Sequence, residues 1–167
     1  STGLLLEISR VLAGRPELAS QIELVFFDGE EAFGSSITDT DGLFGSRHYA
    51  KQMVLVPEKQ RPEFGVLLDM VGDKDLKIRA AIQIPGQSIA SMKQQESPVD
   101  MSEINDTLRT MSRWLLDSAS ELGHRKEVGI SSSYIIDDHI PLNVAAGIPT
   151  IDLIDFDFDY WHTPGDT

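Results

Sequence analysis

Three short apolar runs, each holding an acidic residue or followed directly by one, constrain the fold of this chain most strongly. The runs are IELVFF at residues 22–27, GVLLDMV at residues 65–71 and TIDLI at residues 150–154. Continuous apolar runs of this length predict strands that are buried on both faces of an α/β sheet. Residues 76–84 predict one further strand.

Segments with helical spacing separate these runs. Apolar residues recur every three or four positions in residues 4–12 and 104–122, and two shorter helices are predicted at residues 46–54 and 140–146. Strands that alternate with helices predict an α/β fold with a mostly parallel sheet and helices on both of its faces. In such sheets a ligand binds beyond the carboxyl ends of the strands.

The charge of the chain excludes several classes of function. Asp and Glu number 27 and Lys and Arg 14 among 167 residues, which gives a formal net charge of −13. This balance argues against a nucleic-acid partner and against binding to an anionic membrane surface. No apolar run is long enough to span a membrane. The absence of cysteine excludes disulfides, thiol catalysis and cysteine-based zinc fingers, and it leaves the compartment open.

Acidic and histidine residues gather where the predicted strands end. Because the ligand site of an α/β sheet lies at this edge, we expect side chains next to three of the predicted strands to converge there. The residues concerned are Asp28, Glu30 and Glu31, then Asp69, then Asp137, Asp138 and His139, and finally Asp152, Asp155, Trp161 and His162.

Each of these residues has a structural interpretation beside the functional one. The adjacent carboxylates of Glu30 and Glu31 suit a solvated loop, or a site where one ligates a metal while the other is a general base. His162 is a turn residue or a zinc ligand. Asp69, inside an apolar strand, is a structural hydrogen-bonding group or a site residue. Asp137 lies before a helix start and is the better candidate there for a carboxylate that shares a proton.

Six segments occur in the order found in a known family. The segments VFFDGEEAF, GLFGSRHYA, LLDMVG, DDHIPL, AGIPTIDLIDFDFDYWHT and PGDT resemble the zinc-dependent glutaminyl-peptide cyclotransferases and their relatives, the zinc aminopeptidases of peptidase family M28. The likeness is weakest at residues 79–100. It implies a three-layer αβα sandwich around a mostly parallel mixed sheet. Residues 1–167 would form a single catalytic-type domain cut at both ends, without N-terminal strands and with one metal-ligand segment upstream of Ser1.

The resemblance also implies a role for each matching site residue. One group binds zinc, a second moves protons and a third forms the wall of the substrate pocket. The implied zinc ligands are Glu31 and His162, the implied catalytic residues are Glu30 as acid/base with Asp69 and Asp137, and the implied pocket wall is Trp161, Phe156 and Phe158. The chain departs from the cyclases at Asp152, where they have His, and at residues 34–36, near which animal cyclases carry an aromatic residue.

The implied function is the conversion of an N-terminal glutamine of a peptide or protein to pyroglutamate, with release of ammonia. One zinc ion would polarise the side-chain amide carbonyl, and Glu30 would transfer the proton. The alternative is an aminopeptidase with two zinc ions, in which Glu30 acts on a zinc-bound water and Asp69 ligates the second ion. A further alternative is an inactive homologue with a binding or structural role. The oligomeric state stays open.

Overall fold

The computed structural model describes residues 1–38, 40–84, 99–157, 161 and 163. No helix in these ranges combines the length and the apolar composition that a membrane span requires. The α-helices are α1 (Thr2–Ala13), α2 (Pro16–Ala19), α3 (Phe44–Leu55), α5 (Met101–Glu121) and α6 (His139–Pro141), with a 3-10 helix η1 (Glu58–Gln60) and a π-helical turn η2 (Leu142–Ala146). The strands are β1 (Gly65–Asp69), β2 (Arg79–Ala81), β3 (Gly129–Ile130) and β4 (Thr150–Ile154).

The four strands form one mixed sheet in the order β1-β4-β2-β3. β1 runs parallel to β4 and β2 parallel to β3, while β2 and β4 are antiparallel. The register places Asp69 opposite Ile154 and Leu67 opposite Asp152. Because β1 and β4 are parallel, their carboxyl ends open on the same edge of the sheet. The mixed sheet confirms the predicted α/β class.

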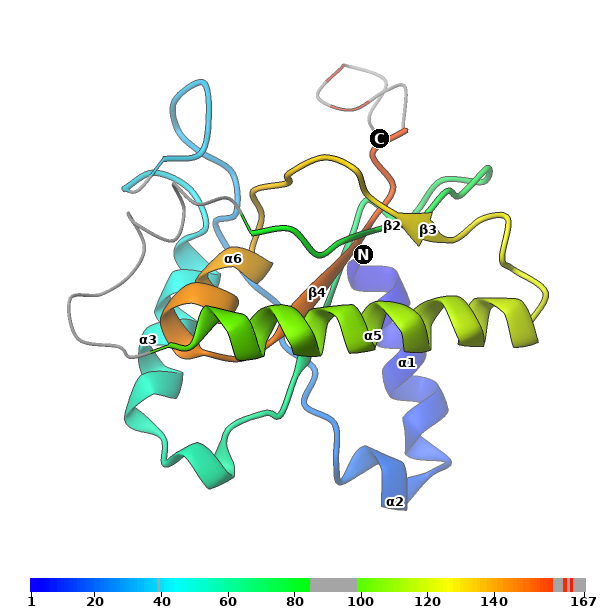
Figure 1. Cartoon of the computed structure of the whole chain (residues 1–167), viewed down its shortest axis with the longest axis horizontal. Helices are drawn as coiled ribbons and strands as arrows, with labels where there is room; N and C mark the ends of the chain where they lie inside the picture. The colour runs from blue at the N-terminus through cyan, green and yellow to red at the C-terminus, as the bar shows by residue number, and fades with distance from the viewer. Residues whose placement is uncertain (39, 85–98, 158–160, 162, 164–167) are drawn as a thin grey trace.

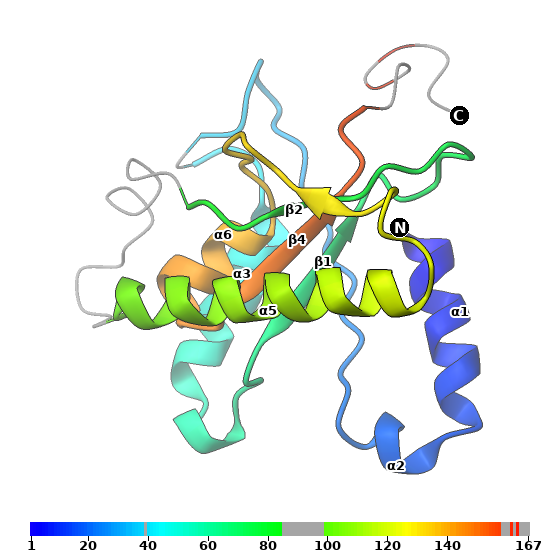
Figure 2. The same ribbon diagram turned by 45° about the vertical axis from the view of Figure 1, so that its right-hand side comes forward.

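Helix α5 covers one face of this sheet. Its side chains Ile104, Leu108 and Met111 pack with Ala80 of β2 and Ile151 of β4 in a buried apolar cluster. Figure 1 shows α5 running across the front of β4, and Figure 2 shows the same arrangement from a second angle. The helix begins at Asp100, whose carboxylate accepts a hydrogen bond from the amide of Ser102 at 2.8 Å.

The opposite face of the sheet is covered by α6, η2 and α3. Ala81 and Ile154 point to this side and pack with Ile135, and a separate buried cluster joins Ala50 of α3 to Ala145 of η2. Side chains alternate between the two faces of a strand, so Asp152 of β4 also points to this side. The sheet therefore lies between two helical layers, as the resemblance implies.

One predicted strand is wrong. Residues 22–27 form no strand, and Ile22 and Phe26 are 47% and 51% exposed. The segment packs through side chains against α3: the ring of Phe27 meets that of Tyr49 edge-on at 5.7 Å, and Glu23 accepts a hydrogen bond from the Tyr49 hydroxyl at 3.2 Å. A strand requires a neighbouring strand for its backbone hydrogen bonds, and among the described residues none pairs with this segment.

The side chain of Asn143 in η2 makes hydrogen bonds both to α6 and to β4. Its side chain is fully buried, and its amide nitrogen donates to the carbonyls of His139 and Thr150, both at 2.8 Å. Its amide oxygen accepts from the Thr150 amide at 3.0 Å. These contacts fix where β4 begins relative to α6, and hence how Asp152 lies beneath the residues around Asp137.

Replacing Asn143 with Ala should destabilise the complete protein by about 3 kcal/mol, because buried backbone groups of Thr150 would lose their partners. Urea unfolding with an intact m-value is the measurement. Gln52→Ala, at an exposed position of α3, is the control and should leave the midpoint within experimental error. Equal midpoints for the two variants would show that Asn143 does not hold the layers together.

Candidate active site

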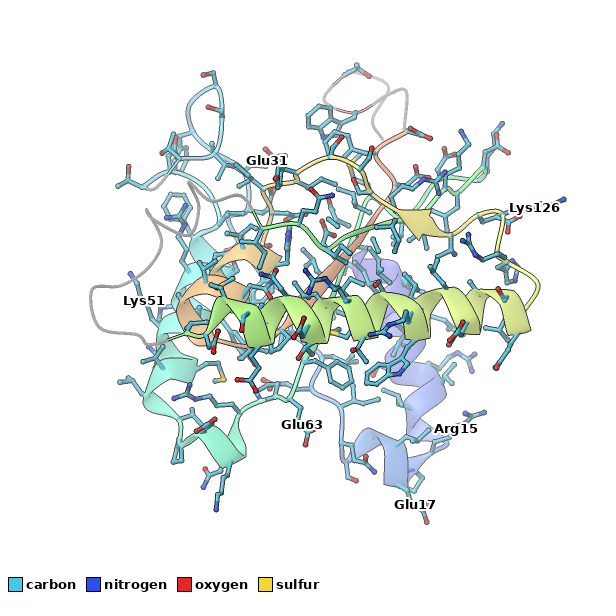
Figure 3. All side chains as sticks on the ribbon, in the orientation of Figure 1. Arg15, Glu17, Glu31, Lys51, Glu63 and Lys126 are labelled. Atoms are coloured by element: carbon cyan, nitrogen blue, oxygen red, sulfur yellow. The ribbon has the colours of Figure 1, made fainter. Side chains whose placement is uncertain are left out.

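Three carboxylates from separate segments meet beyond the carboxyl ends of β1 and β4. Glu30 lies in the loop before α3, Asp69 ends β1, and Asp137 precedes α6. The charges of Asp69 and Glu30 both contribute to the pKa of Asp137, so the three groups lie within electrostatic reach of one another. The charge of Glu31 also contributes to the pKa of Asp69, and Figure 3 shows Glu31 near the top of the view.

Asp137 has a strongly raised pKa. It is buried, and burial is the main cause that raises its pKa to about 8, with smaller contributions from the charges of Asp69, Asp138 and Glu30. A hydrogen bond of 2.5 Å from the Asp138 amide to its Oδ1 opposes this rise. The carboxyl is therefore largely protonated at pH 7 and can donate a hydrogen bond to a neighbouring carboxylate.

The carboxyl of Asp69 is partly buried, and its pKa is also raised. Burial raises its pKa, a hydrogen bond from the Met70 amide lowers it, and the charge of Glu31 raises it slightly. Met70 has φ of +52°, in the left-handed region that residues other than glycine rarely adopt. Such strained positions concentrate at functional sites, where the surrounding fold enforces them.

Asp138 connects this cluster to α3. It occupies the N-cap position of α6, but its side chain makes no capping hydrogen bond; its Oδ1 instead accepts a hydrogen bond of 2.5 Å from the hydroxyl of Ser46, which is fully buried. Burial raises the pKa of Asp138, while the Ser46 hydroxyl lowers it. The carboxylate of Asp138 therefore stabilises a contact between α3 and the start of α6 and does not cap α6.

A Ser46→Ala variant should lose about 2 kcal/mol of stability, since it leaves a buried carboxylate oxygen without its donor. The loss should be larger at pH 8 than at pH 5, because the hydroxyl stabilises the charged form of Asp138. Chemical denaturation at the two pH values measures it, with Ser120→Ala at an exposed position of α5 as control. A loss that does not change with pH would contradict this assignment.

A second buried pair lies under the cluster. His139 and Asp152 are almost completely buried, with 3.7 Å between Nδ1 and Oδ2, and among the described residues neither side chain has a hydrogen-bond partner. Burial raises the pKa of Asp152 to about 9, helped by the charges of Asp137 and Asp69, and it lowers the pKa of His139 to about 3. Both groups are therefore uncharged at pH 7.

The sequence patterns place both residues at the ligand-binding edge of the sheet but assign neither of them a specific role. A usable signal is present for Asp152, since it interrupts the apolar run TIDLI as Asp69 interrupts LLDMV. An acidic residue within a buried strand has to be protonated, paired or hydrogen-bonded. The electrostatic effect of Asp137 and Asp69 on Asp152 places the pair next to the cluster.

Part of the predicted pocket wall can be described. The rings of Phe156 and Trp161 lie 5.1 Å apart at an interplanar angle of 51°, and both side chains are exposed. They follow β4, at the sheet edge where Asp69 also lies. Phe158 and the predicted zinc ligand His162 lie outside the described residues.

The described residues do not make a complete zinc site. Glu31, the one predicted ligand among them, has an exposed side chain. Within residues 1–38, 40–84, 99–157, 161 and 163, no group of three or more His, Asp or Glu side chains is placed to hold a metal ion. Zinc sites in proteins use at least three such ligands.

Comparison with known proteins gives the family. The family model described as peptidase family M28 matches residues 1–167, the whole length of the chain. The chain belongs to peptidase family M28. This match confirms the family resemblance that the six sequence segments of this M28 chain indicate.

Two glutaminyl cyclases and one zinc-dependent exopeptidase are among the proteins that this chain resembles. A glutaminyl-peptide cyclotransferase of Dictyostelium discoideum is 31% identical over 162 residues, which cover 87% of this chain and 40% of that protein. The crystal structure of Bacteroides thetaiotaomicron glutaminyl cyclase bound to N-acetylhistamine matches with TM-score 0.69 and 25% identity, over 99% of this chain and 52% of that one. A Zn-dependent exopeptidase of Parabacteroides distasonis matches with TM-score 0.58 and 25% identity, over 85% and 45%.

The matched proteins are longer than the M28 chain. It spans 40% of the length of the Dictyostelium enzyme and 52% of the Bacteroides one. Both matched cyclases are enzymes by name, and the exopeptidase is named as dependent on zinc. The fold and the family are those predicted from the sequence.

Proposed function

We propose that the complete protein is a glutaminyl cyclase that converts N-terminal glutamine of peptides to pyroglutamate. The observation that supports this most is the electrostatic contact of Glu30, Asp69 and Asp137, with Asp137 protonated near neutral pH. A carboxyl group that stays protonated beside other carboxylates suits the movement of a single proton. The similarity to glutaminyl cyclases from two organisms supports the choice of substrate.

Glu30 is the acid/base of this proposal. Its carboxylate takes a proton from the substrate's α-amino nitrogen, which then bonds to the carbon of the side-chain amide. The bond from that carbon to the amide nitrogen breaks as Glu30 returns the proton, and ammonia leaves. Protonated Asp137 donates a hydrogen bond within the cluster and so orients the carboxylate, and Asp69 shares the same network.

The aromatic residues after β4 hold the substrate in this proposal. Phe156 and Trp161 offer exposed rings in mutual contact, and Phe158 belongs to the same segment of the sequence. Rings of this kind bury the aliphatic part of a glutamine side chain and leave its amide free to react. We place residues 1–167 within a single catalytic-type domain.

Glu31 and His162 are proposed as zinc ligands of the complete protein, supported by the sequence resemblance and by the zinc-dependent exopeptidase among the matches. Glu31→Ala and His162→Ala should each lower zinc affinity at least 10-fold, as loss of a ligand removes one bond to the ion. Competition with a chelating dye measures the affinity. Glu58→Ala, an exposed position in η1, is the control, and unchanged affinity in both ligand variants would refute the assignment.

The second candidate function is a zinc aminopeptidase, favoured by the match to the solved exopeptidase. In it, Asp69 would ligate a second zinc ion. Ammonia release from a glutaminyl peptide and amino-acid release from an aminoacyl peptide, assayed side by side with the zinc content, separate the two functions. One zinc ion with ammonia supports the cyclase, and two zinc ions with free amino acids support the peptidase. Neither product from a zinc-loaded protein supports an inactive homologue.

A further inference from the structure

Backbone hydrogen bonds join the two ends of the loop that follows the Glu30–Glu31 pair. The amide of Leu43 donates to the carbonyl of Glu30 at 2.8 Å, and the amide of Phe44 donates to that of Gly29 at 2.9 Å. Leu43 is fully buried and has φ of +55°, a conformation that costs energy outside glycine. The first turn of α3 therefore fixes the loop and the carboxylate pair relative to each other.

Asp41 organises the interior of the loop. Its two carboxylate oxygens accept hydrogen bonds from the amides of Phe33 at 2.9 Å and Gly34 at 2.8 Å. The carbonyl of Asp41 also accepts from the amide of Thr38 at 2.9 Å. The backbone of Phe33 is therefore held in one place, although the loop extends from the end of the molecule where β4 ends (Figure 1).

This fixed loop exposes an aromatic ring. Phe33 is 93% exposed and Phe44 is 41% exposed, with the two ring centroids 6.0 Å apart. Leaving a Phe side chain in water rather than burying it costs about 2 kcal/mol. Two contacting apolar rings that the backbone holds at the surface form a candidate binding surface.

The charge around this surface identifies what it can bind. From Asp28 to Asp41 the sequence has five acidic residues and no basic residue. Such a segment attracts the positively charged amino terminus of a peptide. Phe33 comes three residues after Glu30, so the Cα atoms of these two residues lie no more than about 11 Å apart. A peptide whose first residue lies at Glu30 can therefore place its second side chain near Phe33.

We propose that Phe33 and Phe44 form the subsite for the residue that comes after the N-terminal glutamine, and that this subsite favours a large apolar side chain. The inference rests on the proposed function. It adds a preference for the second residue, which nothing in the cyclisation chemistry itself requires. Burial of a large apolar side chain against these two rings supplies the preference.

Two tripeptides test this inference in the complete protein, Gln-Phe-Ala and Gln-Gly-Ala. The ratio of their kcat/KM values should be about 10 or more in favour of the Phe peptide, and Phe33→Ala should bring it close to one. Phe33→Leu, which keeps an apolar side chain, should retain most of the ratio. Leu122→Ala, an exposed apolar position at the end of α5, is the control and should leave the ratio unchanged.

The product masses separate failure of this inference from failure of the proposed function. Ammonia loss from both peptides with a ratio near one, or a ratio unaffected by Phe33→Ala, overturns the subsite and leaves the cyclase intact. Removal of the first residue in place of ammonia loss overturns the cyclase. A Phe33-dependent ratio would in that case still support the subsite for the second residue. Consumption of neither peptide overturns the proposed function and the subsite with it.

Discussion

A Glu30→Gln variant of the complete protein should turn over glutaminyl peptides about 10²–10⁴-fold more slowly than the wild type, with KM nearly unchanged. Gln has the shape of Glu but cannot accept and return a proton, so the substitution removes the acid/base step and leaves the pocket in place. Steady-state kinetics of ammonia release measures both constants. The effect should fall on kcat because the proton moves only during the reaction.

Glu23→Gln provides the matched control for this experiment. Glu23 belongs to the same segment before α3, and its carboxylate contacts the hydroxyl of Tyr49 instead of the acidic cluster. Its substitution should leave kcat within about twofold, the range expected for residues away from the chemistry. Full activity of Glu30→Gln would contradict the proposed mechanism, and an equal loss in both variants would indicate a general disturbance of the loop.

An Asp152→Asn variant should be more stable than the wild type at neutral pH, by an amount that grows with pH. The native carboxyl of Asp152 has its pKa raised to about 9 by burial, whereas in the unfolded chain it ionises near a pKa of about 3.9. Between these values the unfolded state releases a proton that the native state keeps, so stability of the wild type falls as pH rises. Asn cannot ionise in either state, and the variant escapes this loss.

The difference in proton binding between the native and the unfolded state also sets the size of this gain in stability. The gain of the variant should be small at pH 4, increase by up to about 1.4 kcal/mol per pH unit, and reach about 4 kcal/mol at pH 7. Urea unfolding at pH 5, 6.5 and 8 measures the slope. Asp117→Asn, at an exposed position of α5, is the control and should show no such slope. A gain that is constant with pH, or a loss at pH 8, would show that Asp152 is ionised in the native state.

An apolar run in the sequence predicts a strand correctly where neighbouring strands are present to pair with it. The apolar run at Thr150–Ile154 forms β4 over its full length, because this strand lies between β1 and β2 and is buried by helices on both faces. The pattern at residues 65–71 gives the shorter β1, since Met70 already turns away with a positive φ. Residues 22–27 have the same composition and form no strand, because strand formation depends on a partner that composition does not reveal.

The candidate site is likewise only partly predictable from local sequence, because some of its contacts depend on the packing of distant segments. The rule that ligands bind at the carboxyl ends of strands selects Asp69, which ends β1. Glu30 is selected through the strand predicted at residues 22–27, which does not form, and Asp137 through its place before β4; the structure nevertheless brings the three carboxylates within electrostatic reach of one another. The burial of His139 and Asp152, and the contact between Ser46 and Asp138, arise from packing between α3, α6 and β4. Residues 92 positions apart in the chain cannot be paired from spacing alone.

The exposure of Phe33 is a further property that the sequence does not reveal. An apolar residue after a carboxylate pair is equally compatible with a place in the core. Its exposure depends on the hydrogen bonds that the amides of Phe33 and Gly34 donate to the carboxylate of Asp41, eight residues after Phe33. Function at this loop is therefore inferred from the structure, whereas the family is inferred from the sequence motifs.

The mass of the product formed from one N-terminal glutaminyl peptide is the decisive measurement for the proposed chemistry. The complete, zinc-loaded protein should convert the peptide to its pyroglutamyl form with loss of one molecule of ammonia, and Glu30→Gln should suppress this product while Glu23→Gln does not. A peptide shortened by its first residue, or one left unchanged by a protein that holds zinc, would contradict the assignment as a glutaminyl cyclase.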